Sequence, residues 1–195
     1  MATRELHVND AYTTVVSNDK KALSLIRPSK TNGPWIAGGA VLRWINNEVV
    51  GDSDIDVFCK NEKQFNKLHE RIRKYYPFSH MHYTDNAITY KCDEWDIQLI
   101  KRKYYNSPQE IISNFDLSVC QLVTDGYKLW YGEHTFADVN NKHLRVVNMK
   151  PGVLNRITKY WIYGYEPSDQ LLDSLSNMPD DFEIVVDMDK EYANV

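Results

Sequence analysis

The order of apolar and polar positions along the chain predicts strands and helices in mixed succession. Two of the strand-like runs flank Thr124-Asp125-Gly126, a sequence typical of a hairpin turn. The predicted strands are residues 34–37, 53–60, 78–83, 87–90, 94–100, 115–123 and 127–131.

Helices are predicted between these strands, where apolar residues recur at spacings of three and four. Phe65, Leu68 and Ile72, for example, share one side of a helix over residues 62–75. The other predicted helices are residues 20–26, residues 40–47, a short helix that begins at Pro108, and residues 154–163. This order indicates an α/β or α+β fold with one mixed sheet and flanking helices.

Composition narrows the class of protein. The 195 residues, 43% of them hydrophobic and 26% charged, suit one globular domain with at most a small appendage. No apolar run approaches the roughly 20 residues of a membrane span, and the N-terminus lacks a signal-peptide core. Cys59, Cys92 and Cys120 have no metal-ligand spacing and are expected to be reduced thiols. We therefore expect a cytoplasmic protein with no membrane partner, in the host cytoplasm if it is viral.

The net charge of −4 is unevenly distributed. After residue 179 six acids stand against one base, which leaves the rest of the chain at +1. A predicted helix with Lys63, Lys67 and Arg71, and the sequence Lys101-Arg102-Lys103, are candidates for guiding a polyanion such as RNA. An ordinary solvated surface explains each of them equally well.

Residues 38–58, GGAVLRWINNEVVGDSDIDVF, carry the strongest chemical signal in the chain. Residues two apart in a strand lie on the same face, so we expect Asp54 and Asp56 to be side by side. Ile55 and Val57 then point into the core. Adjacent carboxylates repel each other unless a cation lies between them, and ligand sets made only of oxygen suit Mg²⁺.

A glycine pair precedes these acids at the start of a predicted helix. Gly38 and Gly39 let the backbone approach a phosphate, and the helix that follows directs N–H groups toward it. Arg43 on this helix contacts either a substrate or a surface carboxylate. Ser53 is a candidate hydrogen-bond donor to the β- or γ-phosphate, or else a capping residue. A phosphate cradle beside metal-binding carboxylates predicts phosphoryl or nucleotidyl transfer.

The glycine pair followed by Asp54-Ile55-Asp56 resembles the signature of the DNA polymerase β-like nucleotidyltransferase superfamily. It is more similar still to the head of tRNA CCA-adding enzymes and bacterial poly(A) polymerases, whose motif GGxVRD…DxD matches residues 38–43 and 54–56. Residues 115–122 resemble that family's nucleotide-sugar segment, although Cys120 replaces an asparagine. Residues 154–165 resemble its neck helix.

This resemblance implies a polymerase β-like fold, with one mixed sheet and flanking helices, and transfer of an NMP from an NTP to a hydroxyl with release of pyrophosphate. Asp54 and Asp56 would hold two Mg²⁺ ions, with Mn²⁺ as an alternative. Asp96, which Ile97 and Leu99 turn away from the core, would bind the catalytic ion as third carboxylate.

The resemblance also implies nucleotide-binding roles farther along the chain. Asp116 would contact the sugar, and Arg156 and Lys159 would contact triphosphate or RNA. It further implies an N-terminal extension over residues 1–33, a nucleotidyltransferase core over residues 34–148, and a neck-like helix with an acidic tail over residues 149–195.

The leading hypothesis is therefore a template-independent nucleotidyltransferase of phage type, with an NTP and an RNA acceptor such as a tRNA 3′ end as partners. One alternative keeps the chemistry but transfers the NMP to a protein or a small molecule. Another is an inactive nucleotide- or RNA-binding module, against which the retention of Asp54, Asp56 and Asp96 argues.

Overall fold

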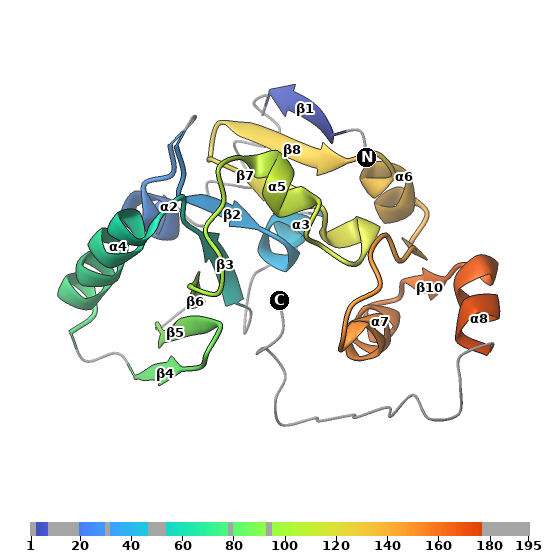
Figure 1. The fold of residues 1–195 in the computed structure, drawn as a ribbon. Coiled ribbons are helices and arrows are strands. Elements are labelled where there is room, and N and C mark those ends of the chain that lie inside the picture. Colours follow the sequence, from blue (N-terminus) through green and yellow to red (C-terminus); the bar gives the residue numbers. More distant parts are fainter. Residues whose placement is uncertain are drawn as a thin grey trace.

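The computed structural model of the chain is built on a large mixed sheet surrounded by helices (Figure 1). It describes residues 3–7, 20–29, 32–46, 54–77, 80–92 and 95–176. The eight strands of this sheet follow the order β1-β8-β7-β2-β3-β6-β5-β4. They are β1 (Thr3–His7), β2 (Trp35–Ala37), β3 (Asp54–Phe58), β4 (Met81–Tyr83), β5 (Ala87–Lys91), β6 (Asp96–Ile100), β7 (Leu122–Thr124) and β8 (Lys128–Gly132).

Neighbouring strands of the sheet are antiparallel, with the exception of the central pair β3 and β6, which is parallel. A second, two-stranded parallel sheet joins β9 (His143–Leu144) to β10 (Glu166–Pro167). The mixed sheet with flanking helices agrees with the fold class predicted from the sequence.

Helices lie around the sheet, and two of them begin with side-chain caps. Asn61 accepts a hydrogen bond from Gln64 N at the start of α4, and Ser107 accepts one from Glu110 N at the start of α5. The helices are α2 (Lys20–Ile26), α3 (Gly39–Ile45), α4 (Glu62–Tyr75), α5 (Pro108–Ile112), α6 (Thr135–Asn140), α7 (Val153–Ile162) and α8 (Asp169–Ser176). Among these described helices, none combines the length and apolarity needed to cross a membrane.

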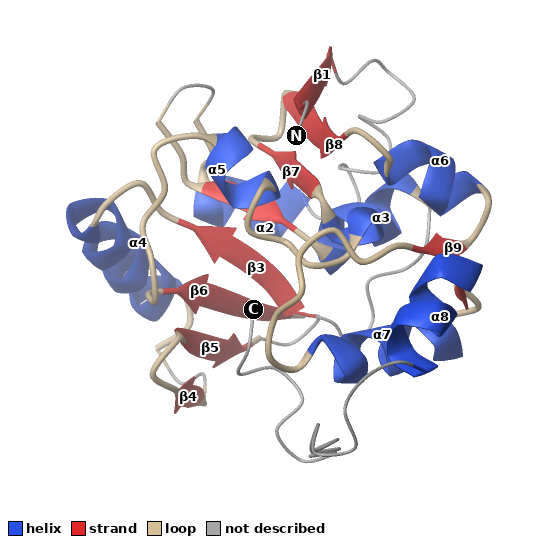
Figure 2. Cartoon of the chain, turned by 45° about the vertical axis from the view of Figure 1, so that its right-hand side comes forward, coloured by secondary structure: helices blue, strands red, loops and turns tan. Residues whose placement is uncertain are grey.

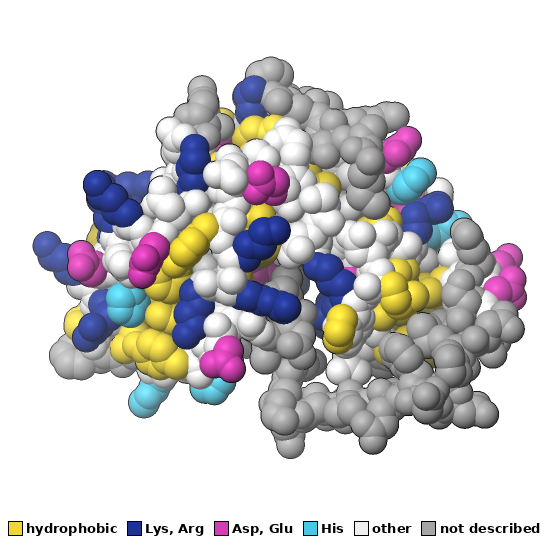
Figure 3. All heavy atoms as spheres, viewed as in Figure 1, with side chains coloured by type: hydrophobic (Ala, Val, Ile, Leu, Met, Phe, Trp, Pro, Cys, Tyr) yellow, Lys and Arg dark blue, Asp and Glu magenta, His cyan; other side chains and the backbone are white. Residues whose placement is uncertain are grey.

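Figures 1 and 2 both show α4 on one side of the molecule and α6, α7 and α8 together on the opposite side. On the face seen in Figure 3, Lys and Arg side chains gather at the side where α4 lies and again between α5 and α7. Basic surface is therefore present at two separate places.

The two faces of the central strands differ in character. Ile55, Ile97 and Tyr90 are aligned on β3, β6 and β5, and all three are fully buried. Helix α4 covers this face, because the His69 ring of α4 is hydrogen-bonded to the Tyr90 hydroxyl. Residues of opposite parity, which include Asp54 and Asp56, therefore lie on the face away from α4.

Most predicted elements are present with small shifts at their ends, but the strand predicted over residues 115–123 is wrong in its first part. Residues Ser118–Cys120 form a 3₁₀ turn, η1, and only Leu122–Thr124 continue as strand β7. The turn at Thr124-Asp125-Gly126 is confirmed, with Gly126 at a φ of 84°.

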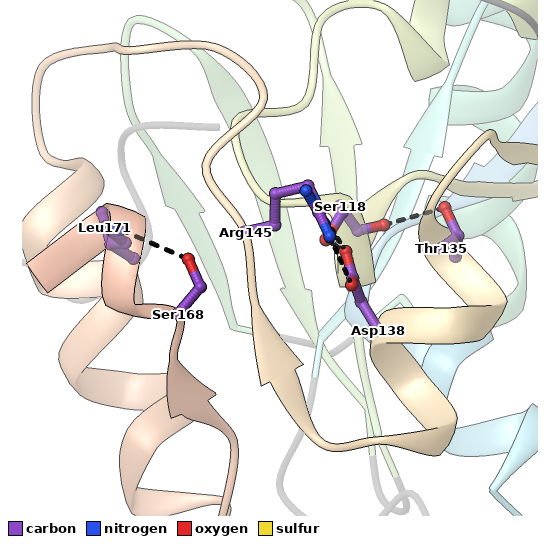
Figure 4. A network of polar contacts seen from close by, with 6 residues as sticks. All are labelled: Ser118, Thr135, Asp138, Arg145, Ser168 and Leu171. Atoms are coloured by element: carbon purple, nitrogen blue, oxygen red, sulfur yellow. Dashed lines mark hydrogen bonds and ion pairs between the residues drawn. The ribbon is translucent and has the colours of Figure 1, made fainter.

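A buried polar network accounts for the departure from strand geometry (Figure 4). The Ser118 hydroxyl donates to Asp138 Oδ2 at 2.6 Å, and Arg145 Nε donates to the same oxygen at 2.9 Å. The Thr135 hydroxyl donates to the Ser118 carbonyl at 2.9 Å. These bonds join η1 to α6 and to the segment that leads toward α7, because Asp138 and Thr135 both belong to α6.

We predict that Asp138→Ala lowers the free energy of unfolding by about 1–3 kcal/mol, because the buried Ser118 hydroxyl loses its acceptor and the partly exposed Arg145 loses its ion pair. Urea unfolding measures this loss. Asp85→Ala, at an exposed turn, is the control and should change the free energy by less than about 0.5 kcal/mol. Equal effects of the two substitutions would show that the network does not hold η1.

Candidate active site

The parallel pairing of β3 and β6 brings the predicted acids together. Asp54 is aligned with Asp96, and Asp56 is aligned with Gln98 on the same face. Both β3 acids are partly exposed, while Ile55 between them is fully buried. The predicted alternation along β3 is therefore confirmed, and Asp96 lies on the strand beside Asp54.

Burial and mutual repulsion raise the pKa values of the two β3 carboxyls. For Asp54 the largest cause is desolvation, followed by the charge of Asp96. For Asp56 desolvation, and then the charge of Asp54, raise the pKa to about 7. A cation that approaches such a carboxyl group stabilises its ionised form.

Cations from three other elements face these carboxylates. Lys91 of β5 forms an ion pair with Asp96, and its charge lowers the pKa of Asp54. Lys159 of α7 acts on both β3 carboxyls in the same direction, and Arg43 of α3 acts on Asp56. The strand register, α3 and α7 thus converge on one charged site.

An oxygen-only donor set of this kind is suited to a hard divalent cation. Within the residues that the structure describes, however, no three Asp, Glu, His or Cys side chains form a cluster able to hold a metal ion. Asp96 is paired with the Lys91 ammonium, which supplies positive charge at this place. Asp54 and Asp56 thus fit a metal ion as a pair, and Asp96 would have to leave Lys91 to join them.

The glycine turn lies against the acids. Gly38 has φ 76° and ψ −140°, a combination that side chains oppose, and its N–H donates to the Leu122 carbonyl at 2.9 Å. A Cβ at Gly38 would lie 3.3 Å from the Phe115 ring and 3.6 Å from Asp56 Oδ2. The absence of a side chain therefore lets the backbone lie close to the carboxylate.

Gly39, the next residue, is bordered by two polar side chains. A Cβ there would lie 3.3 Å from Arg43 Nη1 and 3.4 Å from the Tyr160 hydroxyl. Arg43 Nη2 also donates to the Asp54 carbonyl at 3.5 Å, whereas Arg43 Nε is buried with no partner among the described residues. A buried N–H without a partner is costly. A ligand that accepts a hydrogen bond from Arg43 Nε would remove this cost.

Asp116 and Arg156 form an ion pair with each other. Asp116 is 4% exposed, and its Oδ1 also accepts from Leu117 N at 3.0 Å. Asp116 and Arg156 are thus bonded to each other in the absence of a nucleotide. To contact them as predicted, a nucleotide would have to compete with this ion pair or bind beside it.

A group of cations surrounds this pair. Lys150 donates to the Asn114 carbonyl, and burial lowers the pKa of its ammonium, which Asp116 opposes. Three further cations lower the same pKa and so lie nearby, namely Arg156, Arg102 and Lys103. Such a group suits a polyphosphate.

The structure thus brings most of the predicted site residues onto one face of the sheet. These are Gly38, Gly39, Arg43, Asp54, Asp56, Asp96 and Lys159. Ser53 lies outside the described residues. Sequence reasoning missed Lys91, Lys150 and Tyr160; Lys91 would have followed from the alternation along β5 once its pairing with β6 was known.

Comparison with known proteins identifies the family. The model of the Gabija anti-defense 2 family matches residues 7–142, which is well over half of the chain. The chain belongs to this family. No curated protein sequence matches this family member significantly.

Solved structures share the fold of this Gabija anti-defense 2 family member. A CCA-adding enzyme in complex with ATP has a TM-score of 0.63 at 14% identity, over 87% of this chain and 45% of that one. The Thermotoga maritima CCA-adding enzyme complexed with tRNA has a TM-score of 0.62 at 14% identity, over 89% of this chain and 46% of that one. A tRNA nucleotidyltransferase with a primer tRNA and an incoming ATP analog has a TM-score of 0.55 at 14% identity, over 72% of this chain and 45% of that one.

This chain spans less than half the length of each of these three structures. At such low identity the likeness shows a nucleotidyltransferase fold of the polymerase β-like type. The predicted fold is therefore confirmed, and the sequence resemblance to CCA-adding enzymes agrees with these structural neighbours.

The raised pKa of Asp56 gives a prediction for the protein without divalent cations. Its pKa of about 7 lies above the ordinary value of 3.8, so folding takes up a proton between these values. The contribution of this carboxyl to stability therefore falls as the pH rises from about 4 to about 7. Asp56→Asn should remove this cost and raise the free energy of unfolding at pH 8 by roughly 1–3 kcal/mol, and by almost nothing below about pH 4.

Thermal unfolding in EDTA at a series of pH values measures this difference. Asp85→Asn, at an exposed turn, is the matched control and should behave as the native chain does. If Asp56→Asn destabilised the protein at pH 8, the carboxylate would be contributing to stability, and the repulsion inferred here would be wrong.

Proposed function

We propose that this chain is a nucleotidyltransferase that moves an NMP from an NTP to a hydroxyl acceptor. The observation that carries the proposal is the alignment of Asp54 with Asp96 across the parallel pair β3 and β6, with Asp56 beside them. The raised pKa values of the β3 carboxyls and the Gly38-Gly39 turn next to Asp56 support it. The fold shared with CCA-adding enzymes agrees with this chemistry.

Divalent cations, with two Mg²⁺ ions as the first choice and Mn²⁺ as the alternative, would be held by Asp54, Asp56 and Asp96. When bound, they would supply charge neutralisation for the triphosphate and acidify the attacking hydroxyl. On this proposal Lys91 holds Asp96 until the substrate complex forms. The Lys91 side chain is 60% exposed and can leave the contact at little cost.

The remaining residues bind and orient the substrate. Arg43 and Lys159 would offset the charge of the triphosphate, and the glycine turn would admit its oxygens close to the backbone. The hydroxyl oxygen attacks the α-phosphorus, pyrophosphate leaves, and the hydroxyl proton passes to water or to Asp96. Asp116 and Arg156 would contact the nucleotide sugar and the phosphates or RNA, respectively, after their ion pair opens.

Two acceptors are supported by separate observations. RNA is favoured by the cations around Lys150 and by neighbours whose structures hold tRNA. The family name, Gabija anti-defense 2, favours instead a component of the Gabija defence as the target, and thus transfer to a protein. In either case the proposed role is to counter that defence by nucleotidyl transfer.

The test is label transfer. The purified chain is incubated with each α-³²P-labelled NTP, Mg²⁺, total RNA and lysate from cells that carry Gabija. Label is expected in RNA or in a protein band. Asp54→Asn and Asp56→Asn should each reduce transfer roughly 1,000-fold or more, because each removes charge needed in the transition state. Asp85→Asn should transfer normally. Substantial transfer by either β3 variant would refute the assignment of these carboxylates.

The glycine turn gives a second prediction. Gly39→Val should weaken NTP binding about tenfold or more, because the added side chain presses on Arg43 and Tyr160 and fills the space beside the backbone. Calorimetry with a non-hydrolysable NTP measures the affinity. Ala137→Val, at an exposed position of α6, controls for a valine in a helix. Unchanged affinity in folded Gly39→Val would mean that the turn is purely structural.

A further inference from the structure

A pocket between α2 and α4 lies away from the carboxylates. It encloses about 180 Å³ and is lined by the end of α2, the residues before β2, and one side of α4. Helix α4 covers the face of the sheet opposite to Asp54 and Asp56, as the contact between His69 and Tyr90 shows. The pocket is therefore separate from the candidate active site.

Three of the side chains that line this pocket are cations: Arg27, Lys67 and Arg71. None of its lining residues is acidic. Burial, and then the charge of Arg27, lower the pKa of Arg71, so the two guanidinium groups lie close enough to repel each other. Like charges held around a cavity are unfavourable in the absence of a ligand, and an anion would relieve the repulsion.

Contacts with α2 explain part of this arrangement. Arg71 Nη1 donates to the Leu25 and Ile26 carbonyls at 3.1 and 3.2 Å, and Arg27 Nε donates to the Ser24 carbonyl at 3.3 Å. These bonds cap the C-terminal end of the helix. They use only part of each guanidinium, whose five N–H groups leave donors for a ligand.

Lys67 takes no part in this capping. It is exposed, lines the same pocket and has no hydrogen-bond or ion-pair partner among the described residues. Arg27, in contrast, has a φ of 52° because it follows the last residue of α2, where its N–H donates to the Leu23 carbonyl at 2.8 Å and closes a left-handed helix cap. The Lys67 ammonium is therefore available to a ligand of the pocket.

The charge of the pocket continues along α4. Lys63 and Lys74 recur at helical spacing with Lys67 and Arg71, so these four residues form a row along one side of the helix, with Glu70 as one acid among them. At 1.5 Å per residue this row is about 16 Å long. A free phosphate would occupy the pocket alone, whereas a nucleic-acid strand carries a phosphate at every nucleotide and can contact the whole row.

We propose that the pocket formed by Arg27, Lys67 and Arg71 binds a backbone phosphate of a nucleic-acid strand, which lies along α4 on the side of the sheet opposite to the carboxylates. The guanidinium groups hold the phosphate oxygens by charge-assisted hydrogen bonds, and the Lys67 ammonium adds a point charge. Binding at this site needs neither an NTP nor a divalent cation.

Fluorescence anisotropy of a labelled single-stranded RNA oligonucleotide, titrated with the full chain in EDTA and without NTP, tests the proposal. Lys67→Gln and Arg27→Gln should each weaken binding about tenfold, since each removes a charged phosphate contact. Each should also reduce the slope of log K against log salt by about 0.7. Arg27→Lys, which keeps the charge, should bind more tightly than Arg27→Gln.

Arg73→Gln is the matched control, because it removes one exposed charge from the same helix at a position that does not line the pocket. It should change affinity less than about twofold and leave the salt slope unchanged. Equal losses in Arg73→Gln and Lys67→Gln would show a diffuse charge effect and overturn the pocket. Absence of RNA binding by the native chain would overturn it as well. Neither result depends on transfer activity, so the proposed function would stand or fall separately.

Discussion

The repulsion among three carboxylates on two neighbouring parallel strands is the constraint to which much of this structure responds. The parallel register aligns Asp54 with Asp96 and leaves Asp56 one step away on the same face. Such a cluster is unfavourable in isolation, and the rest of the fold compensates for it. Lys91, Arg43 and Lys159 bring positive charge from β5, α3 and α7. The opposite face of the same strands contributes to stability, because it buries Ile55, Val57, Ile97 and Leu99 completely and is covered by α4.

Local sequence pattern predicted the parts of this arrangement that depend on short-range geometry. The period of two placed Asp54 and Asp56 on one face, and the glycine pair placed the turn before α3. The partners that come from distant elements were not predictable in this way. Lys91 reaches Asp96 only because β5 pairs with β6, and a local pattern does not specify strand order.

The segment before β7 shows a second limit of such prediction. Its apolar residues read as a continuous strand, but Ser118 donates to Asp138 of α6, and the backbone turns to make that bond. A side-chain contact across twenty residues thus overrides local propensity. The same segment holds Asp116 against Arg156, so the interior polar contacts that shape the fold also position candidate nucleotide-binding residues.

Cation binding by the carboxylates is the most direct test of this account, and thermal unfolding with increasing Mn²⁺ measures it without reference to any substrate. The native chain should be stabilised by about 2.7 kcal/mol when Mn²⁺ reaches 100 times its dissociation constant, because only the folded state brings Asp54 and Asp56 together. Asp54→Asn should lose most of this stabilisation, and Asp85→Asn should keep it. Equal stabilisation of the native chain and Asp54→Asn would contradict the claim that these carboxylates form a cation site.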